Sequence, residues 1–69
     1  YAEALNNLGV ALTRLGRREE AAGHFSKAIR IDPHYAEAHY NLGKCLLDEG
    51  RLGDALARFS AALQIKPST

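Results

Sequence analysis

The chain has 69 residues, and its nine Lys or Arg and eight Asp or Glu give a net charge of +1. This balance excludes the strongly basic surface that would predict nucleic acid or an anionic membrane as the main partner. No stretch reaches the roughly 18 apolar residues of a membrane span, so we expect no membrane insertion. A chain of this length forms one domain with a marginal core. The single Cys45 excludes an internal disulfide framework and fits a reducing compartment such as the cytoplasm.

Apolar side chains at helical spacing predict a first helix over residues 2–15. Its expected buried stripe consists of Ala4, Leu5, Leu8, Ala11, Leu12 and Leu15. Gly9 lies inside this helix, where glycine costs about 1 kcal/mol relative to alanine, so we expect a close helix contact there. Gly16 follows and suits the left-handed residue that ends a helix.

Glu19 and Glu20 predict the first turn of a second helix, because carboxylates are favourable at the positive end of the helix dipole. The residues expected to be buried are Ala21, Ala22, Phe25, Ala28, Ile29 and Ile31. Small alanines let two antiparallel helices approach, and the ring of Phe25 fills the space between them. Asp32-Pro33 ends this helix, since proline disfavours a helical residue before it.

The same pattern recurs 34 residues later and predicts helices over about 35–49 and 52–66. Under this shift 16 of the 35 overlapping positions are identical, against the roughly two expected by chance, so the chain contains an internal repeat. Identical pairs include Leu8/Leu42, Gly9/Gly43, Leu12/Leu46, Gly16/Gly50, Ala21/Ala55, Phe25/Phe59 and Pro33/Pro67. The buried set expected in the second copy is Ala38, Leu42, Leu46, Ala55, Leu56, Phe59, Ala62, Leu63 and Ile65. We place repeat one at 1–34 and repeat two at 35–68.

This period, with its fixed small and large positions, resembles the tetratricopeptide repeat, a helix-turn-helix unit. The resemblance covers nearly the whole chain. It implies an all-α fold in which two antiparallel helix pairs form a short right-handed solenoid, one domain over 1–69. The usual aromatic residue at the first core site is Leu5 in one copy and His39 in the other, and we expect His39 to lie between the repeats with one ring nitrogen in water. Since about three such units are needed for stability, we expect a fragment of a longer array whose uncapped ends self-associate.

Residue types that carry catalysis or bind metals form no recognisable constellation. Cys45 occupies the small position that Ala11 holds in the first copy, which favours a buried, inert thiol over a nucleophile. His24, His34 and His39 have no partner at i, i+4 spacing and no nearby cysteine pair, which argues against a metal site. We therefore expect neither enzyme activity nor a cofactor in this chain.

In the family's architecture the first helix of each unit lines the inner face of the solenoid, which implies that this face binds a peptide segment of a partner protein. The peptide-binding residues that we predict are Asn6, Asn7, Val10, Arg14, Tyr40, Asn41, Lys44 and Asp48. Asn7 and Asn41 are equivalent, and an amide can both donate to and accept from the backbone of an extended peptide. The alternative is that these amides bond neighbouring helices or water.

Two arrangements known in the family bear on these positions. Arrays similar to the one in O-linked N-acetylglucosamine transferases present an asparagine ladder, which Asn7 and Asn41 resemble. A carboxylate clamp needs Lys and Asn where this chain has Asn6 and Val10, so only Asn41 fits, and a segment of mixed character suits the face better than a strongly acidic tail. The resemblance thus implies a protein-interaction scaffold. The alternatives are a substrate-recruiting arm of a larger enzyme, such as a glycosyltransferase, or a self-assembly element.

Overall fold

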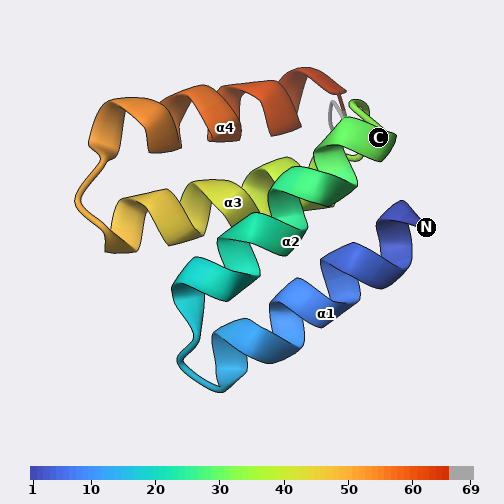
Figure 1. The fold of residues 1–69 in the computed structure, drawn as a ribbon. Helices are drawn as coiled ribbons and strands as arrows, with labels where there is room; N and C mark the ends of the chain where they lie inside the picture. The colour runs from blue at the N-terminus through green and yellow to red at the C-terminus, as the bar shows by residue number, and fades with distance from the viewer. Residues whose placement is uncertain (66–69) are drawn as a thin grey trace.

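The computed structural model describes residues 1–65, which form two antiparallel pairs of helices (Figure 1). The helices are α1 (Ala2–Arg14), α2 (Arg18–Ile31), α3 (Ala36–Asp48) and α4 (Leu52–Ile65). The predicted all-α fold and its four helices are therefore confirmed, with ends that differ by about one residue where the prediction gave them. Lys66 and Pro67, at the predicted end of the last helix and of the repeat pattern, lie outside the described residues.

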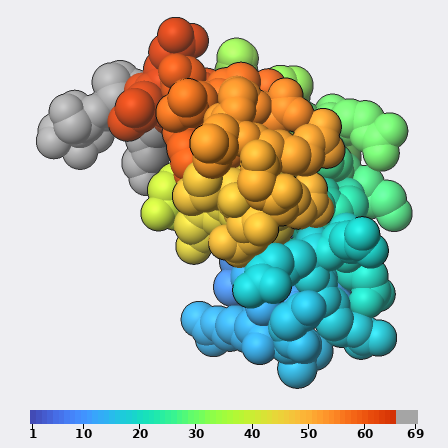
Figure 2. Space-filling model, turned by 90° about the vertical axis from the view of Figure 1, so that its left-hand side faces the viewer, coloured from blue at the N-terminus to red at the C-terminus, as the bar shows by residue number. Residues whose placement is uncertain are grey.

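The second helix pair, α3 and α4, stacks on the first pair, α1 and α2, as the space-filling view from the side of the α3–α4 turn shows (Figure 2). Each helix packs most extensively on its partner within the pair. Contact between the pairs is carried mainly by α2 and α3, with a smaller contribution from α1 and α3. The helix α3 therefore lies against both helices of the first pair.

The first helix of each pair ends at a glycine in the left-handed conformation, with φ 81° at Gly16 and 80° at Gly50. After α1, the backbone N–H of Arg17 donates to the carbonyl of Leu12 at 2.9 Å, and that of Gly16 donates to Thr13 at 3.0 Å. These are the two bonds of a Schellman motif, which satisfies carbonyls left open at a helix end. Both bonds recur 34 residues later, so the two pairs turn in the same way.

The core is built where the two phenylalanine rings meet glycines on the partner helix. Phe25 is 1% exposed, and a Cβ atom added at Gly9 would lie 2.8 Å from its Cδ1. A Cβ atom at Gly43 would lie 2.9 Å from Cδ1 of Phe59. Both distances are shorter than packed carbon atoms tolerate. The close helix contact expected at Gly9, and at the equivalent Gly43, is confirmed.

The core continues across the junction between the pairs. Its central cluster joins Leu12, Ala21 and Phe25 of the first pair to Cys45 of α3, and the half-buried Leu42 packs against it. A single apolar cluster thus fixes α3 on the first pair.

Several residues predicted to be buried are exposed, because they lie on faces that no described helix covers. These residues are Ala4, Leu8, Ala11, Leu15, Ile31, Leu56 and Leu63. Phe59, also predicted to be buried, is only half-buried. The helical period identified which face of each helix is apolar. Residues on such a face are buried only where another described helix packs against it.

His39 is buried at the junction of the pairs, and both of its ring nitrogens are bonded. Nε2 lies 2.9 Å from the carbonyl oxygen of Pro33, and Nδ1 lies 3.1 Å from Nη1 of Arg58. A carbonyl can only accept, so Nε2 carries the proton and Nδ1 accepts from the guanidinium. The expectation that one nitrogen faces water is therefore wrong, since Arg58 on α4 reaches it.

Candidate functional site

A groove of about 450 Å³ lies between α1 and α3, the two helices that the sequence predicted to line the inner face. Its lining residues are Val10, Thr13, Arg14, Phe25, Asn41, Lys44, Cys45, Leu47 and Asp48. Except for Phe25 on α2, all of them come from α1 or α3. Apolar side chains from both pairs therefore lie beside amide and charged groups in one concave surface.

The structure brings some of the predicted peptide-binding residues together and separates the others. Those that line the groove are Val10, Arg14, Asn41, Lys44 and Asp48. Asn6 is fully buried, whereas Asn7 is exposed outside the groove. Tyr40 packs against Phe59 with ring centroids 5.6 Å apart, at a separate hollow between α3 and α4.

Phe25 and Cys45 also line the groove, although the sequence assigned both to the core alone. The signal for Cys45 was present, because it lies one helical turn after Asn41 and so shares its face. Nothing in the sequence indicated that Phe25 lines the groove. Its ring reaches the groove from α2 by passing over Gly9, and the residue spacing within α1 and α3 does not reveal a contribution from α2.

The amide of Asn41 bridges the two helix pairs at the edge of the groove. Its Nδ2 donates to Oδ1 of Asn6 at 3.1 Å, and the two side chains are 9% and 0% exposed. Nδ2 of Asn6 is also buried and has no hydrogen-bond partner among the described residues. For Asn41, the alternative of a bond to a neighbouring helix is therefore the observed one, and the bond fixes how α3 is rotated against α1.

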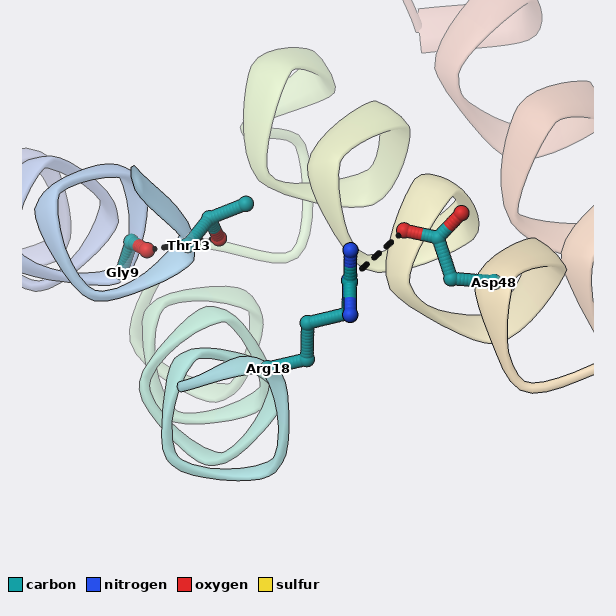
Figure 3. Close-up of polar contacts among 4 residues, drawn as sticks. All are labelled: Gly9, Thr13, Arg18 and Asp48. Carbon is teal, nitrogen blue, oxygen red and sulfur yellow. Dashed lines mark hydrogen bonds and ion pairs between the residues drawn. The ribbon is translucent and has the colours of Figure 1, made fainter. Parts of the chain in front are cut away.

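The charges around the groove are only partly compensated. Nε of Arg18, at the start of α2, lies 3.0 Å from Oδ2 of Asp48, at the end of α3 (Figure 3). Lys44 Nζ lies 5.2 Å from the centroid of the Tyr40 ring, and Arg14 forms no ion pair among the described residues. The groove therefore carries two cationic side chains, while its carboxylate is already paired.

Two further groups that line the groove, the hydroxyl of Thr13 and the thiol of Cys45, are not reactive towards a ligand. Thr13 Oγ1 donates to the carbonyl of Gly9 at 2.9 Å, so its proton is used inside α1 (Figure 3). Burial raises the pKa of the Cys45 thiol, and the nearby Asp48 and Glu49 raise it further. A thiol with a raised pKa stays protonated and is a poor nucleophile. The predicted burial of Cys45 is confirmed.

Across residues 1–65, no group of three His, Cys, Asp or Glu side chains gathers in a way that could hold a metal ion. Within the same range, no helix has both the length and the apolar character needed to cross a membrane.

The family model of the tetratricopeptide repeat matches residues 12–69. Together with the two stacked helix pairs, this match shows that the chain belongs to the tetratricopeptide-repeat family. The family consists in general of protein–protein interaction modules, and its repeats are typically non-catalytic. Comparison with curated protein sequences gave no match.

Proposed function

We propose that the groove between α1 and α3 holds an extended segment of a partner protein, without any bond being made or broken. The observation that carries this proposal is the composition of the groove. Val10 and Leu47 supply apolar surface over the buried ring of Phe25, and the charged groups of Arg14 and Lys44 lie beside it. A concave apolar surface with a few polar groups is the usual form of a binding site in proteins.

The chemistry of the groove suggests what the segment contains. An apolar side chain suits the surface around Leu47, which is itself part exposed. Arg14 and Lys44 call for at least one carboxylate, since Asp48 is already paired with Arg18. We therefore propose a segment of mixed character in which an apolar residue is close to an acidic one. The charged contacts are solvent-exposed, so binding should weaken as salt rises.

Asn41 has a different part in this proposal from the one its spacing suggested. Its Nδ2 is used by Asn6, so it cannot offer both halves of its amide to a ligand. Oδ1 accepts no hydrogen bond from the described residues. We propose that this oxygen accepts a backbone N–H of the bound segment, while the rest of the side chain maintains the shape of the groove.

The proposal can be tested with peptides selected from a random display library against the chain. For the selected peptides we expect Arg14→Glu to weaken binding by about tenfold or more, equivalent to about 1.4 kcal/mol. Lys27→Glu is the matched control, because Lys27 is also an exposed cation but lies on α2 outside the groove. Affinity would be measured by fluorescence polarisation at two salt concentrations. Peptides that bind wild type and Arg14→Glu equally would show that the groove is not the site.

The same contacts would serve if the module recruited substrates for an enzyme domain elsewhere in a longer chain. In that case too, we propose that this chain contributes binding and no chemical step of its own.

A further inference from the structure

The charged side chains on α1 and α3 are sorted by sign along these two helices. Both helices run in the same direction, so their first turns lie at one end of the molecule and their last turns at the other (Figure 1). Glu3 and Glu37 are in the first turns. Arg14 is in the last turn of α1, and Lys44 lies in the second half of α3. One end is therefore anionic, and the other carries the two cationic side chains of the groove.

Glu3 and Glu37 lie on the same stripes of their helices as residues that line the groove. Glu3 precedes Val10 by seven residues, and Glu37 precedes Lys44 by seven. Seven residues make two helical turns, so the side chains in each pair point in directions that differ by only about 20°. Along the helix axis the two members of each pair are about 10 Å apart. Val10 and Lys44 line the groove, so the two carboxylates continue its rim towards the helix starts.

The hydroxyl of Tyr35, the residue before α3, indicates that the two carboxylates gather at one place. Burial raises the pKa of this hydroxyl, and the negative charges of Glu37 and Glu3 raise it further. Residues from both helices therefore lie close enough to act on one group. The amide of Asn6 lies beside the same hydroxyl and acts on its pKa in the opposite direction. Because Asn41 uses Oδ1 of Asn6, the atom presented here is the buried Nδ2, which has no hydrogen-bond partner among residues 1–65.

The carboxylates beside Tyr35 are not neutralised by a cation within the described residues. Glu3 and Glu37 are both exposed, and neither forms an ion pair there. Asp32 also raises the pKa of Tyr35 and so adds negative charge nearby. Within residues 1–65 no three such groups could hold a metal ion, but a lysine or arginine side chain needs only one or two carboxylates. We call Glu3, Glu37 and the Tyr35 hydroxyl the acidic end of the groove.

We propose that the segment bound in the groove carries a lysine or arginine that lies over the acidic end, in addition to the carboxylate that faces Arg14 and Lys44. This inference rests on the proposed function and adds the charge order of the segment. Along the helix axis, Glu37 lies about 10 Å from Lys44 and Glu3 about 16 Å from Arg14. An extended chain advances about 3.3 Å per residue, so roughly three to five positions separate the two charged residues. Val10 lies between Glu3 and Arg14 on α1 and favours an apolar residue between them.

The charge order distinguishes this segment from one that carries a single sign of charge. A segment that is acidic throughout would place like charges against Glu3 and Glu37, and a basic one would do so against Arg14 and Lys44. Only a segment with opposite charges at its two ends is attracted at both. Exposed ion pairs contribute little one by one, so the preference depends on the whole pattern.

The test uses the peptides selected from the display library, together with a chain in which both carboxylates are neutralised. Those peptides should contain a lysine or arginine at that spacing from an acidic residue. The double variant Glu3→Gln/Glu37→Gln should weaken their binding about fivefold, as expected for exposed ion pairs. Glu19→Gln is the matched control, because Glu19 is also an exposed carboxylate in the first turn of a helix but lies outside the groove. Circular dichroism would verify that all variants fold.

Replacing the basic residue of the peptide with glutamine tests whether the contact is direct. This change should weaken binding to wild type about fivefold and should not weaken binding to the double variant further. The proposal is overturned if the selected peptides lack a basic residue at that spacing, or if the double variant binds them as tightly as wild type. If Arg14→Glu still weakens binding in that case, the groove is the site and only the acidic end is wrong. If neither change alters affinity, both proposals fail.

Discussion

The two helix pairs share a sequence skeleton but have different surroundings. Phe25 and Phe59 occupy the same position and lie over equivalent glycines, yet Phe25 is 1% exposed and Phe59 is half-buried. The residues that differ in exposure face the neighbouring pair in one copy and face no described helix in the other. The comparison shows that in a repeat fold a neighbour completes the core of each unit, so identical residues can stabilise the chain by different amounts.

The largest effect that separates the pairs should come from shortening the two phenylalanines. We expect Phe25→Ala to cost about 3–5 kcal/mol, because it leaves a cavity in an enclosed site. Phe59→Ala should cost less, roughly 2 kcal/mol, since part of its side chain already meets water. Urea unfolding followed by circular dichroism measures both. A domain of this size has a total stability of roughly 3–10 kcal/mol, so Phe25→Ala removes a large share of it. Equal costs would remove the distinction between the pairs.

A smaller effect is expected where alanine replaces the glycines beneath these rings. At Gly9 the new methyl group collides with an enclosed ring, and we expect a loss of about 1–3 kcal/mol. At Gly43 the loss should be smaller, because the half-buried ring of Phe59 can move outwards. Gly23 is the control, since no atom lies within 4 Å of a Cβ added there, and Gly23→Ala should gain about 1 kcal/mol of helix stability. A gain at Gly9 as well would mean that the contact is looser than the structure indicates.

The smallest difference should be seen in the equivalent asparagines. Asn41→Ala leaves the buried Oδ1 of Asn6 without its donor, at an expected cost of about 1–2 kcal/mol. Asn7→Ala removes an exposed amide with no such bond and should change stability by less than about 0.5 kcal/mol. Thermal melts would compare the two variants. A double replacement of Asn6 and Asn41 by Leu checks the cause, because it removes both partners of the bond.

The helices and their internal contacts could be predicted from the sequence because their causes are local or repeated. Apolar spacing fixed the helix faces, and the recurrence of glycine opposite phenylalanine indicated a close approach in both pairs. Of the residues predicted from α1 and α3, Val10, Arg14, Asn41, Lys44 and Asp48 line the groove between these helices. That they bind a peptide stays a prediction.

The rotation of α3 against α1 could not be predicted. Asn6 and Asn7 are neighbours about 100° apart on one helix, and the sequence does not reveal which of them faces the following pair. The structure shows that Asn6 does, and that Tyr40 at the equivalent place of α3 therefore points towards the open end of the second pair. The bond from Arg58 to His39 could not be predicted either. The equivalent residue in the first copy is Leu5, which has no ring nitrogen, so the repeat pattern contained no sign of it.

The imidazole of His39 links three parts of the molecule: α3, the connection between α2 and α3, and α4. One ring is bonded both to the connection between α2 and α3, through Pro33, and to α4, through Arg58. A change in the angle between the two pairs would move the Pro33 carbonyl relative to the His39 ring. If the ring followed the carbonyl, its distance to Arg58 would change too. A change in the angle between the pairs therefore strains a bond to α4 as well. Leu5, at the equivalent position of the first pair, has no ring nitrogen and offers no such link.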